Sequence, residues 1–183
     1  MALNSKERDK IMIIYNKIVP DDFDVPLIVK GNGFILRPLT PEYSDLDYDA
    51  VMKSKSILSD IFSDSWPEDI NSAEDNLNYI EEDYEDFKNR IGFSYIILDP
   101  DELTCFGCVY IFPSVFEGSD VAIYYWFNIT IVDTQLSLSV EKFIREWIDS
   151  YWKIKDPAYP GRDIPWSKWL SRPRKKFPLR KIQ

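Results

Sequence analysis

The chain has 183 residues, of which 45% are hydrophobic, 15% aromatic and 29% charged, and none is histidine. This composition is typical of a globular domain with a single hydrophobic core, and it excludes fibrous and low-complexity classes. Without histidine, neither a Ser-His-Asp nor a Cys-His catalytic site can form, so proton transfer must use carboxylates, tyrosines, lysines or water.

Charge is distributed unevenly along the chain. The net charge is −9, yet residues 161–183 contain eight Lys or Arg and one acid, which leaves −16 on residues 1–160. An acidic body of this kind is a poor nucleic-acid binder. No apolar run approaches the roughly 18 residues of a membrane span, and residues 1–10 lack the features of a secretory signal. With only two cysteines, we expect a cytoplasmic protein.

The N-terminal part of the chain predicts a helix and then a hairpin. Apolar residues recur at helical spacing over residues 5–19, and Pro20 ends that helix. Two short strands follow, residues 27–29 and 34–37, and the Gly-Asn-Gly turn between them favours a hairpin.

Two amphipathic helices are expected after the hairpin. Ser44 and Asp47 resemble a capping pair for a helix over residues 44–55, and Ser72 with Asp75 caps a second helix. The outer face of the second helix is strongly acidic and is interpreted as a solvated face, with attraction of a cationic or amine substrate as the functional alternative. Its acids are Glu74, Asp75, Glu81, Glu82, Asp83, Glu85 and Asp86.

Three strands and a long helix form the centre of the predicted fold. Residues 92–98, 105–112 and 121–127 are rich in β-branched and aromatic residues, and the short turns between them favour antiparallel neighbours. Apolar side chains occur on both faces of the strands, so both faces of the sheet are expected to be buried. The helix that follows carries an apolar stripe of Leu136, Val140, Phe143, Ile144, Trp147, Ile148 and Tyr151.

Cys105 and Cys108 form a Cys-x-x-Cys pair. A redox pair is expected at a helix start with one exposed thiol, whereas a regular strand places residues three apart on opposite faces. A zinc site would need two more good ligands, and the chain has no further cysteine and no histidine. We therefore expect two buried strand residues and no metal.

Several short motifs along the chain carry a family resemblance. They are Phe34-Ile-Leu-Arg-Pro-Leu-Thr, Leu46-Asp-Tyr-Asp-Ala-Val-Met, Trp66-Pro, Asn76-Leu, Phe93-x-Tyr-x-Ile-Leu-Asp-Pro-Asp, Gly107-Cys-Val-Tyr-Ile and Tyr159-Pro-Gly-Arg. In these motifs and in the order of its secondary-structure elements, the chain resembles an uncharacterised bacterial branch of the GNAT acyltransferase superfamily over roughly residues 25–165.

The resemblance implies an α/β (α+β) GNAT-like fold, with a mostly antiparallel central sheet flanked by helices and truncated at the C-terminal end. It implies one domain over residues 1–170, in which residues 1–24 are a helical extension. Residues 171–183 are expected to be a basic, flexible tail.

The resemblance also implies acetyl-CoA, or another acyl-CoA, as co-substrate. In that superfamily the pantetheine arm runs along the backbone of the third central strand, and the pyrophosphate lies on the N-terminus of the long helix. The implied cofactor-binding candidates are Trp126, Phe127, Asn128, Gln135, Ser137, Ser139 and Arg145. The alternative for Asn128 is to end the strand, and the alternative for Arg145 is an ion pair with Glu141 one turn away.

The sequence departs from the GNAT pattern at the phosphate loop. The superfamily motif is Gln/Arg-x-x-Gly-x-Gly/Ala, and the best alignment begins at Gln135, with Leu138 and Val140 in place of the small residues. Ser137 and Ser139 supply hydroxyl donors there. The last helix and strands of a complete GNAT domain are also missing, and with them the tyrosine that often protonates the leaving thiolate.

Asp120, Tyr124 and Tyr110 are the catalytic candidates, with Asp120 as proton acceptor. The lead function is acyl-CoA-dependent N-acyl transfer to an amine of a small molecule or protein, and a homodimer is compatible with the sequence. One alternative is a catalytically inactive GNAT-like module that binds a ligand or protein. Another is an interaction protein whose basic tail binds an anionic partner.

Overall fold

A five-stranded antiparallel sheet forms the centre of the molecule, with the strand order β2-β3-β4-β5-β6. The computed structural model describes residues 11–13, 17–58, 61, 66–176 and 179–181. The strands of this sheet are β2 (Val29–Gly31), β3 (Phe34–Pro38), β4 (Phe93–Leu98), β5 (Cys105–Pro113) and β6 (Val121–Phe127).

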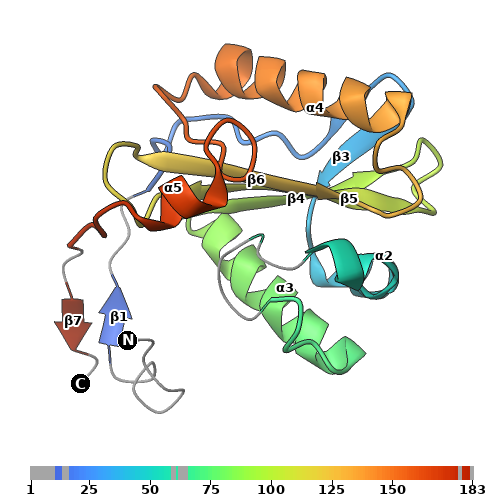
Figure 1. Ribbon diagram of the computed structural model, residues 1–183, viewed down its shortest axis with the longest axis horizontal. Coiled ribbons are helices and arrows are strands. Elements are labelled where there is room, and N and C mark those ends of the chain that lie inside the picture. The colour runs from blue at the N-terminus through green and yellow to red at the C-terminus, as the bar shows by residue number, and fades with distance from the viewer. Residues whose placement is uncertain (1–10, 14–16, 59–60, 62–65, 177–178, 182–183) are drawn as a thin grey trace.

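Helices cover both faces of this sheet (Figure 1). Two of them, α2 and α3, lie on one face, while α4 lies on the other face and continues into the π-helical turn η2. The predicted α+β class, an antiparallel sheet flanked by helices, is therefore confirmed. The helical elements are η1 (Pro41–Tyr43), α2 (Ser44–Leu58), α3 (Ala73–Lys88), α4 (Gln135–Trp147), η2 (Ile148–Trp152) and α5 (Trp166–Leu170).

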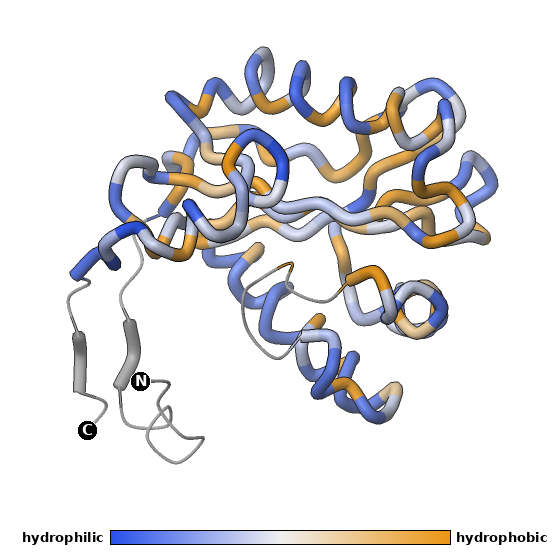
Figure 2. Tube along the Cα trace, in the orientation of Figure 1, coloured by the Kyte–Doolittle hydropathy of each residue, from blue (hydrophilic) through white to orange (hydrophobic). Residues whose placement is uncertain are grey.

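Alternation along the strands produces two apolar layers. Tyr95 and Ile97 of β4 pack in one core with Val140 of α4, whereas Ile96 and Leu98 belong to a second core beneath α2 and α3. Figure 2 shows α4 with its hydrophobic residues toward the sheet and its hydrophilic residues on the opposite side. Both faces of the sheet are thus buried, as the pattern predicts.

A β-bulge interrupts β5 beside the two cysteines. Ile97 lies opposite Gly107, but Leu98 lies opposite Cys105, so the register shifts by one residue. Gly107 has φ +143°, and a Cβ there would lie 2.0 Å from the backbone oxygen of Trp126. The bulge turns Cys105 to the side of Cys108, so the prediction of opposite faces is wrong, because it assumed regular alternation.

The N-terminal helix prediction is wrong where the structure describes it. Ile11–Ile13 form strand β1, which pairs antiparallel with β7 (Leu179–Lys181), and residues 17–24 contain no helix. A strand partner far along the chain decides this conformation, and local periodicity cannot report it. Residues 5–10 and 14–16 lie outside the described residues.

Residues 171–176 lie along the loop between β5 and β6. The backbone N–H of Lys175 donates to the Val115 carbonyl at 2.9 Å, and the N–H of Glu117 donates to the Pro173 carbonyl at 2.9 Å. The first half of the expected flexible tail is therefore attached to the body. Composition alone could not reveal these backbone hydrogen bonds.

The sheet ends at β6, and among the described residues a bridge to Ala158 covers the first half of its outer edge. Ile123 N–H donates to the Ala158 carbonyl at 2.8 Å, and Ala158 N–H donates to the Val121 carbonyl at 2.9 Å. Alternate residues of a strand direct their backbone N–H and C=O groups to the same edge. The backbone groups of Tyr125 and Phe127 therefore point to the same outer edge as those of Val121 and Ile123, in the half of β6 that Ala158 does not cover.

Candidate active site

A cavity of about 270 Å³ lies between the helices α2 and α3 and the strands β5 and β6. We name it the acid cavity, because Asp47 and Asp83 line it and none of its described lining residues is a lysine or an arginine. Aromatic side chains form much of its wall. The aromatic residues are Trp66, Tyr79, Tyr110, Phe112 and Tyr124.

Asp83 provides the acid cavity with a carboxyl group of unusually high pKa. Ser94 Oγ donates a hydrogen bond to Asp83 Oδ2 at 2.7 Å. Burial raises the pKa of Asp83 to about 7, and the nearby Asp86, Asp47 and Glu82 carboxylates also raise it. A carboxylate with a pKa near neutrality is suited to accept a proton at physiological pH.

Asp47 points into the interior instead of capping α2, so the predicted capping pair with Ser44 is wrong. Its Oδ2 accepts a hydrogen bond from Asn76 Nδ2 at 3.0 Å, and its Oδ1 accepts one from the Cys108 thiol at 3.1 Å. Burial raises the pKa of the Asp47 carboxyl. This side chain therefore joins α2, α3 and β5 beside the acid cavity.

Tyr110, one of the catalytic candidates, lines the same cavity. Its hydroxyl accepts a hydrogen bond from the Trp126 indole nitrogen at 3.2 Å. Burial raises the pKa of Tyr110 well above its usual range, so the hydroxyl stays protonated. Trp126, predicted to bind the cofactor, thus orients this tyrosine.

A second cavity, of about 370 Å³, lies along the open half of the β6 edge. We name it the edge cavity. Tyr125, Trp126 and Phe127 of β6 contribute to its lining, and so do Arg162 and Trp166 from the segment that follows the Ala158 bridge. Arg162 Nη2 donates to the Tyr125 carbonyl at 3.3 Å, so one backbone group of the edge is already engaged.

Tyr124 lies between the two cavities and lines both. Its ring stacks on that of Trp166, with centroids 6.3 Å apart and planes 9° apart. A group bound in the edge cavity and a group bound in the acid cavity would therefore both contact this tyrosine. Of the three catalytic candidates, Tyr124 and Tyr110 are brought together at one place.

Asp120 lies apart from both cavities. Its carboxylate is 3.0 Å from Lys175 Nζ, and its side chain is 98% exposed. An acid at a turn before a strand is as compatible with this solvated position as with a cleft, and the sequence cannot distinguish the two.

The start of α4 is closed by its own side chains. Thr134 Oγ1 accepts from the Ser137 N–H, and Ser137 Oγ accepts from the Thr134 N–H, which makes a reciprocal capping box. Ser139 donates to the Gln135 carbonyl within the helix. The loop that precedes the helix ends at Asp133, which has φ +60° and lines the edge cavity. The residues aligned with the phosphate-loop motif, which begin at Gln135, thus lie in the first turns of α4 and not in the loop before it.

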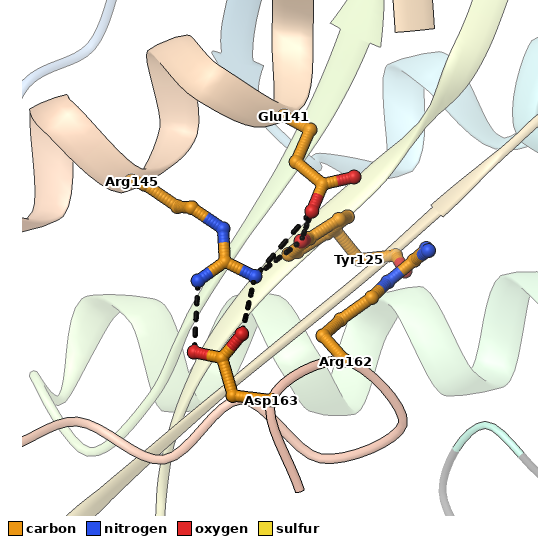
Figure 3. A network of polar contacts seen from close by, with 5 residues as sticks. All are labelled: Tyr125, Glu141, Arg145, Arg162 and Asp163. Carbon is orange, nitrogen blue, oxygen red and sulfur yellow. Dashed lines mark hydrogen bonds and ion pairs between the residues drawn. The ribbon is translucent and has the colours of Figure 1, made fainter. Parts of the chain in front are cut away.

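Arg145, the predicted phosphate ligand, belongs to a polar network that fastens the segment after Ala158 (Figure 3). Its guanidinium donates to both carboxylate oxygens of Asp163 at 2.9 and 3.0 Å, and it lies 3.4 Å from Glu141 Oε1. The Tyr125 hydroxyl donates to the same Glu141 oxygen at 2.7 Å. The Arg162 guanidinium lies 4.5 Å above the Tyr125 ring.

Asn128 ends β6 and stabilises the turn that follows. Its amide nitrogen donates to the Cys105 carbonyl at 3.1 Å, and its amide oxygen accepts from the N–H and the hydroxyl of Thr130 at 3.1 Å each. The remaining cofactor candidate, Phe127, is buried and lines the edge cavity.

Sequence reasoning missed Asp83, although a signal was present. Asn76, Ile80, Asp83 and Phe87 follow one another at steps of four, three and four, which is the spacing of one helix face. Ile80 and Phe87 are buried members of that face. From the sequence, all the acidic residues of α3 are interpreted as solvated. This interpretation overlooks that Asp83 lies on the same buried helix face as Ile80 and Phe87.

Comparison with known proteins gives a consistent picture of the fold. No protein-family model and no curated protein matches the sequence. Among solved structures, the ribosomal-protein-S5-alanine acetyltransferase from Vibrio fischeri matches with a TM-score of 0.58 at 13% identity, over 81% of each chain. A microcin C7 self immunity acetyltransferase in complex with acetyl-CoA and AMP matches with a TM-score of 0.52 at 22% identity, over 69% of each chain.

The sheet, its helices and the open β6 edge therefore define an acetyltransferase-type α+β fold. More narrowly, it is the GNAT fold, since a GNAT-family acetyltransferase from Bacillus anthracis also matches, with a TM-score of 0.54 at 11% identity over 72% of each chain. The resemblance drawn from the motifs is confirmed at this level. No helix within the described residues is both long and apolar enough to cross a bilayer.

Proposed function

We propose that the chain is an acyl-CoA-dependent N-acyltransferase. The thioester arm lies in the edge cavity along β6, and the acceptor amine lies in the acid cavity. The observation that carries the proposal is the position of Tyr124, which lines both cavities and so brings their occupants to one residue. Bringing two reactants together in this way is a large part of what an acyltransferase must do.

Asp83 is the proton acceptor in this proposal. An amine reaches the site mainly as an ammonium ion and must lose a proton before it can attack a thioester carbonyl. Asp83 is ionised above a pH of about 7, because its pKa is raised to about 7, and it lies in the wall of the acid cavity. The Tyr110 hydroxyl, which stays protonated, lies in the same wall.

Solved structures of this fold suggest which acceptors to test. They include a ribosomal L7/L12 alpha-N-protein acetyltransferase in complex with coenzyme A, with a TM-score of 0.52 and 14% identity over 66% of this chain and 67% of that one. The microcin C7 self immunity enzyme also shares the fold. We therefore infer a protein N-terminus or a small-molecule amine as acceptor, and a cytoplasmic location for a chain with two free thiols.

A second candidate is a GNAT-like module that binds a ligand without catalysis. The start of α4 favours it, because the capping box occupies the first turn and the acidic residue Asp133, which lines the edge cavity, directly precedes the N-cap Thr134. The negative charge of Asp133 would repel a pyrophosphate bound next to it. The loop also lacks the glycines that permit close approach to phosphates.

Calorimetry with acetyl-CoA and an assay for released thiol separate these candidates. Binding, together with thioester consumption by at least one member of a panel of peptide N-termini and alkylamines, supports the transferase. Binding with no consumption across the panel supports the binding module. Absence of heat up to millimolar acetyl-CoA contradicts the edge cavity as an acyl-CoA site in either case.

A further inference from the structure

Two buried cysteines and a buried aspartate meet beside the acid cavity, and the proposed function uses none of them. The ligand atoms of Asp47, Cys105 and Cys108 all lie within 4.8 Å of one another. All three residues are buried, with exposed fractions of 4%, 3% and 0%. They come from α2 and β5, which lie far apart in sequence.

The β-bulge is what brings the two sulfur atoms together. In a regular strand Cys105 and Cys108 would point to opposite faces. The register shift and the positive φ of Gly107 direct both toward the α2 side, where Asp47 projects. Bulges commonly re-aim a side chain next to a functional site.

The Asp47 carboxylate is buried without a cationic neighbour. Its hydrogen-bond donors are the neutral Asn76 amide and the Cys108 thiol. In the part of the chain that the structure describes, no lysine or arginine forms an ion pair with it. A buried carboxylate is costly unless a charge partner or a metal ion balances it.

We propose that Asp47, Cys105 and Cys108 bind a zinc ion. Thiolate sulfur selects zinc over magnesium or calcium, and a carboxylate oxygen completes a set that zinc accepts. On binding, the two thiols release their protons to solvent, and both sulfurs and one Asp47 oxygen become ligands. The Asn76 amide, bonded to the other Asp47 oxygen, holds the carboxylate in place.

The site has the composition of an open zinc centre. Zinc is usually four-coordinate, and three protein ligands leave one position for water or another small ligand. Asp47 lines the acid cavity, so that position is supplied from there. The prediction of no metal counted only cysteine and histidine ligands, and it assumed that the two cysteines diverge.

Cobalt(II) is the probe for this site, because its thiolate complexes absorb near-ultraviolet and visible light, whereas the corresponding zinc complexes do not. The full-length protein, treated with a chelator and kept reduced, is titrated with cobalt(II) and then with zinc(II). We expect a thiolate-to-cobalt charge-transfer band that saturates at one equivalent and is removed by one equivalent of zinc. The readout needs no acyl-CoA, so it does not depend on the proposed transferase activity.

Variants test whether these three residues form the site. Asp47→Asn, Cys105→Ser and Cys108→Ser should each weaken cobalt binding at least tenfold. Asp83→Asn, which alters the other carboxylate of the same cavity, should leave cobalt binding within twofold. An unchanged band in both serine variants would overturn the assignment.

Measurements on the unmodified chain keep the proposal testable if a variant does not fold. Zinc should raise the melting temperature of the chelator-treated protein, and elemental analysis should find one zinc per chain after growth with added zinc. A folded protein that shows no cobalt band and no thermal shift contradicts the proposal. So does a thiol titration in denaturant that finds Cys105 and Cys108 joined as a disulfide.

Discussion

The two cavities that meet at Tyr124 differ in the polar groups that each offers to a bound reactant. On one side, the acid cavity holds carboxylates from α2 and α3, a protonated tyrosine from β5, and aromatic side chains from α3, β5, β6 and the loop before α3. On the other, the edge cavity offers an open strand edge but ends at a helix start occupied by Asp133 and a capping box. In the proposed function, the cavity for the acceptor amine thus has the groups that its chemistry needs, whereas the cavity for the acyl donor lacks the glycine-rich loop that holds phosphates.

The largest expected effect falls on the acceptor side. Asp83→Asn removes the proposed proton acceptor and should lower kcat by about 10²- to 10⁴-fold, while the Kd for acetyl-CoA stays within twofold. Asp120→Asn tests the acid favoured by the sequence, and we expect less than a twofold change because that side chain is exposed and pairs with Lys175. Steady-state kinetics and calorimetry measure both. The reverse ranking would move the acceptor role to Asp120.

The pH dependence should follow the same carboxylate. The pKa of Asp83 is raised to about 7, so the ionised, proton-accepting form is lost as the pH falls below that value. We expect kcat/KM to rise about tenfold per pH unit below 7 and to level off above it. A profile recorded from pH 5 to 9 checks this. A plateau that extends unchanged to pH 5 would exclude Asp83 as the base.

A smaller effect should follow from loosening the wall of the edge cavity. Arg145→Lys replaces a bidentate contact with Asp163 by a single one, and the free energy of unfolding should fall by about 1–2 kcal/mol. Urea denaturation measures it. Lys142→Ala on the same helix, an exposed residue 3.7 Å from Glu146, is the matched control and should change stability by no more than about 0.5 kcal/mol.

The smallest expected effect tests whether Asp133, at the start of α4, weakens the binding of acetyl-CoA in the edge cavity. Asp133→Gly removes a carboxylate from the start of α4 and relieves a positive φ, so acetyl-CoA should bind about fivefold more tightly, or by about 1 kcal/mol. Asp156→Gly, a second aspartate at positive φ, is the control. Equal Kd values for both variants and the parent chain would show that the helix start does not contact the nucleotide.

Periodicity predicted the elements well where burial alone shapes them. The three central strands and the apolar stripe of α4 follow from alternation and from steps of three and four. Ile97 and Tyr125 on the strands and Ile144 on the helix all belong to the core that these patterns predict. Such elements need no knowledge of distant partners, because each residue's spacing already identifies the face that it buries.

The residues that we propose to be functional were harder to predict, for physical reasons. Asp47 and Asp83 occupy inward positions of their helices, where a polar residue looks like surface until the packing partner is known. Cys105 and Cys108 point to the same side of the sheet because of a bulge that Gly107 permits. The two-residue alternation used to assign faces in a regular strand cannot predict such a bulge. The edge cavity depends on where the segment at Ala158 stops pairing with β6, which is a contact between distant parts of the chain.

The attachment of residues 171–176 has a practical consequence for handling the protein. These residues hydrogen-bond the loop that contains Val115, and Val115 forms part of the acid cavity wall. An attachment point close to residues 171–176 would therefore disturb a loop of the acid cavity wall. Immobilised assays are therefore better anchored through an exposed side chain of α4, such as Lys142, on the opposite face of the sheet.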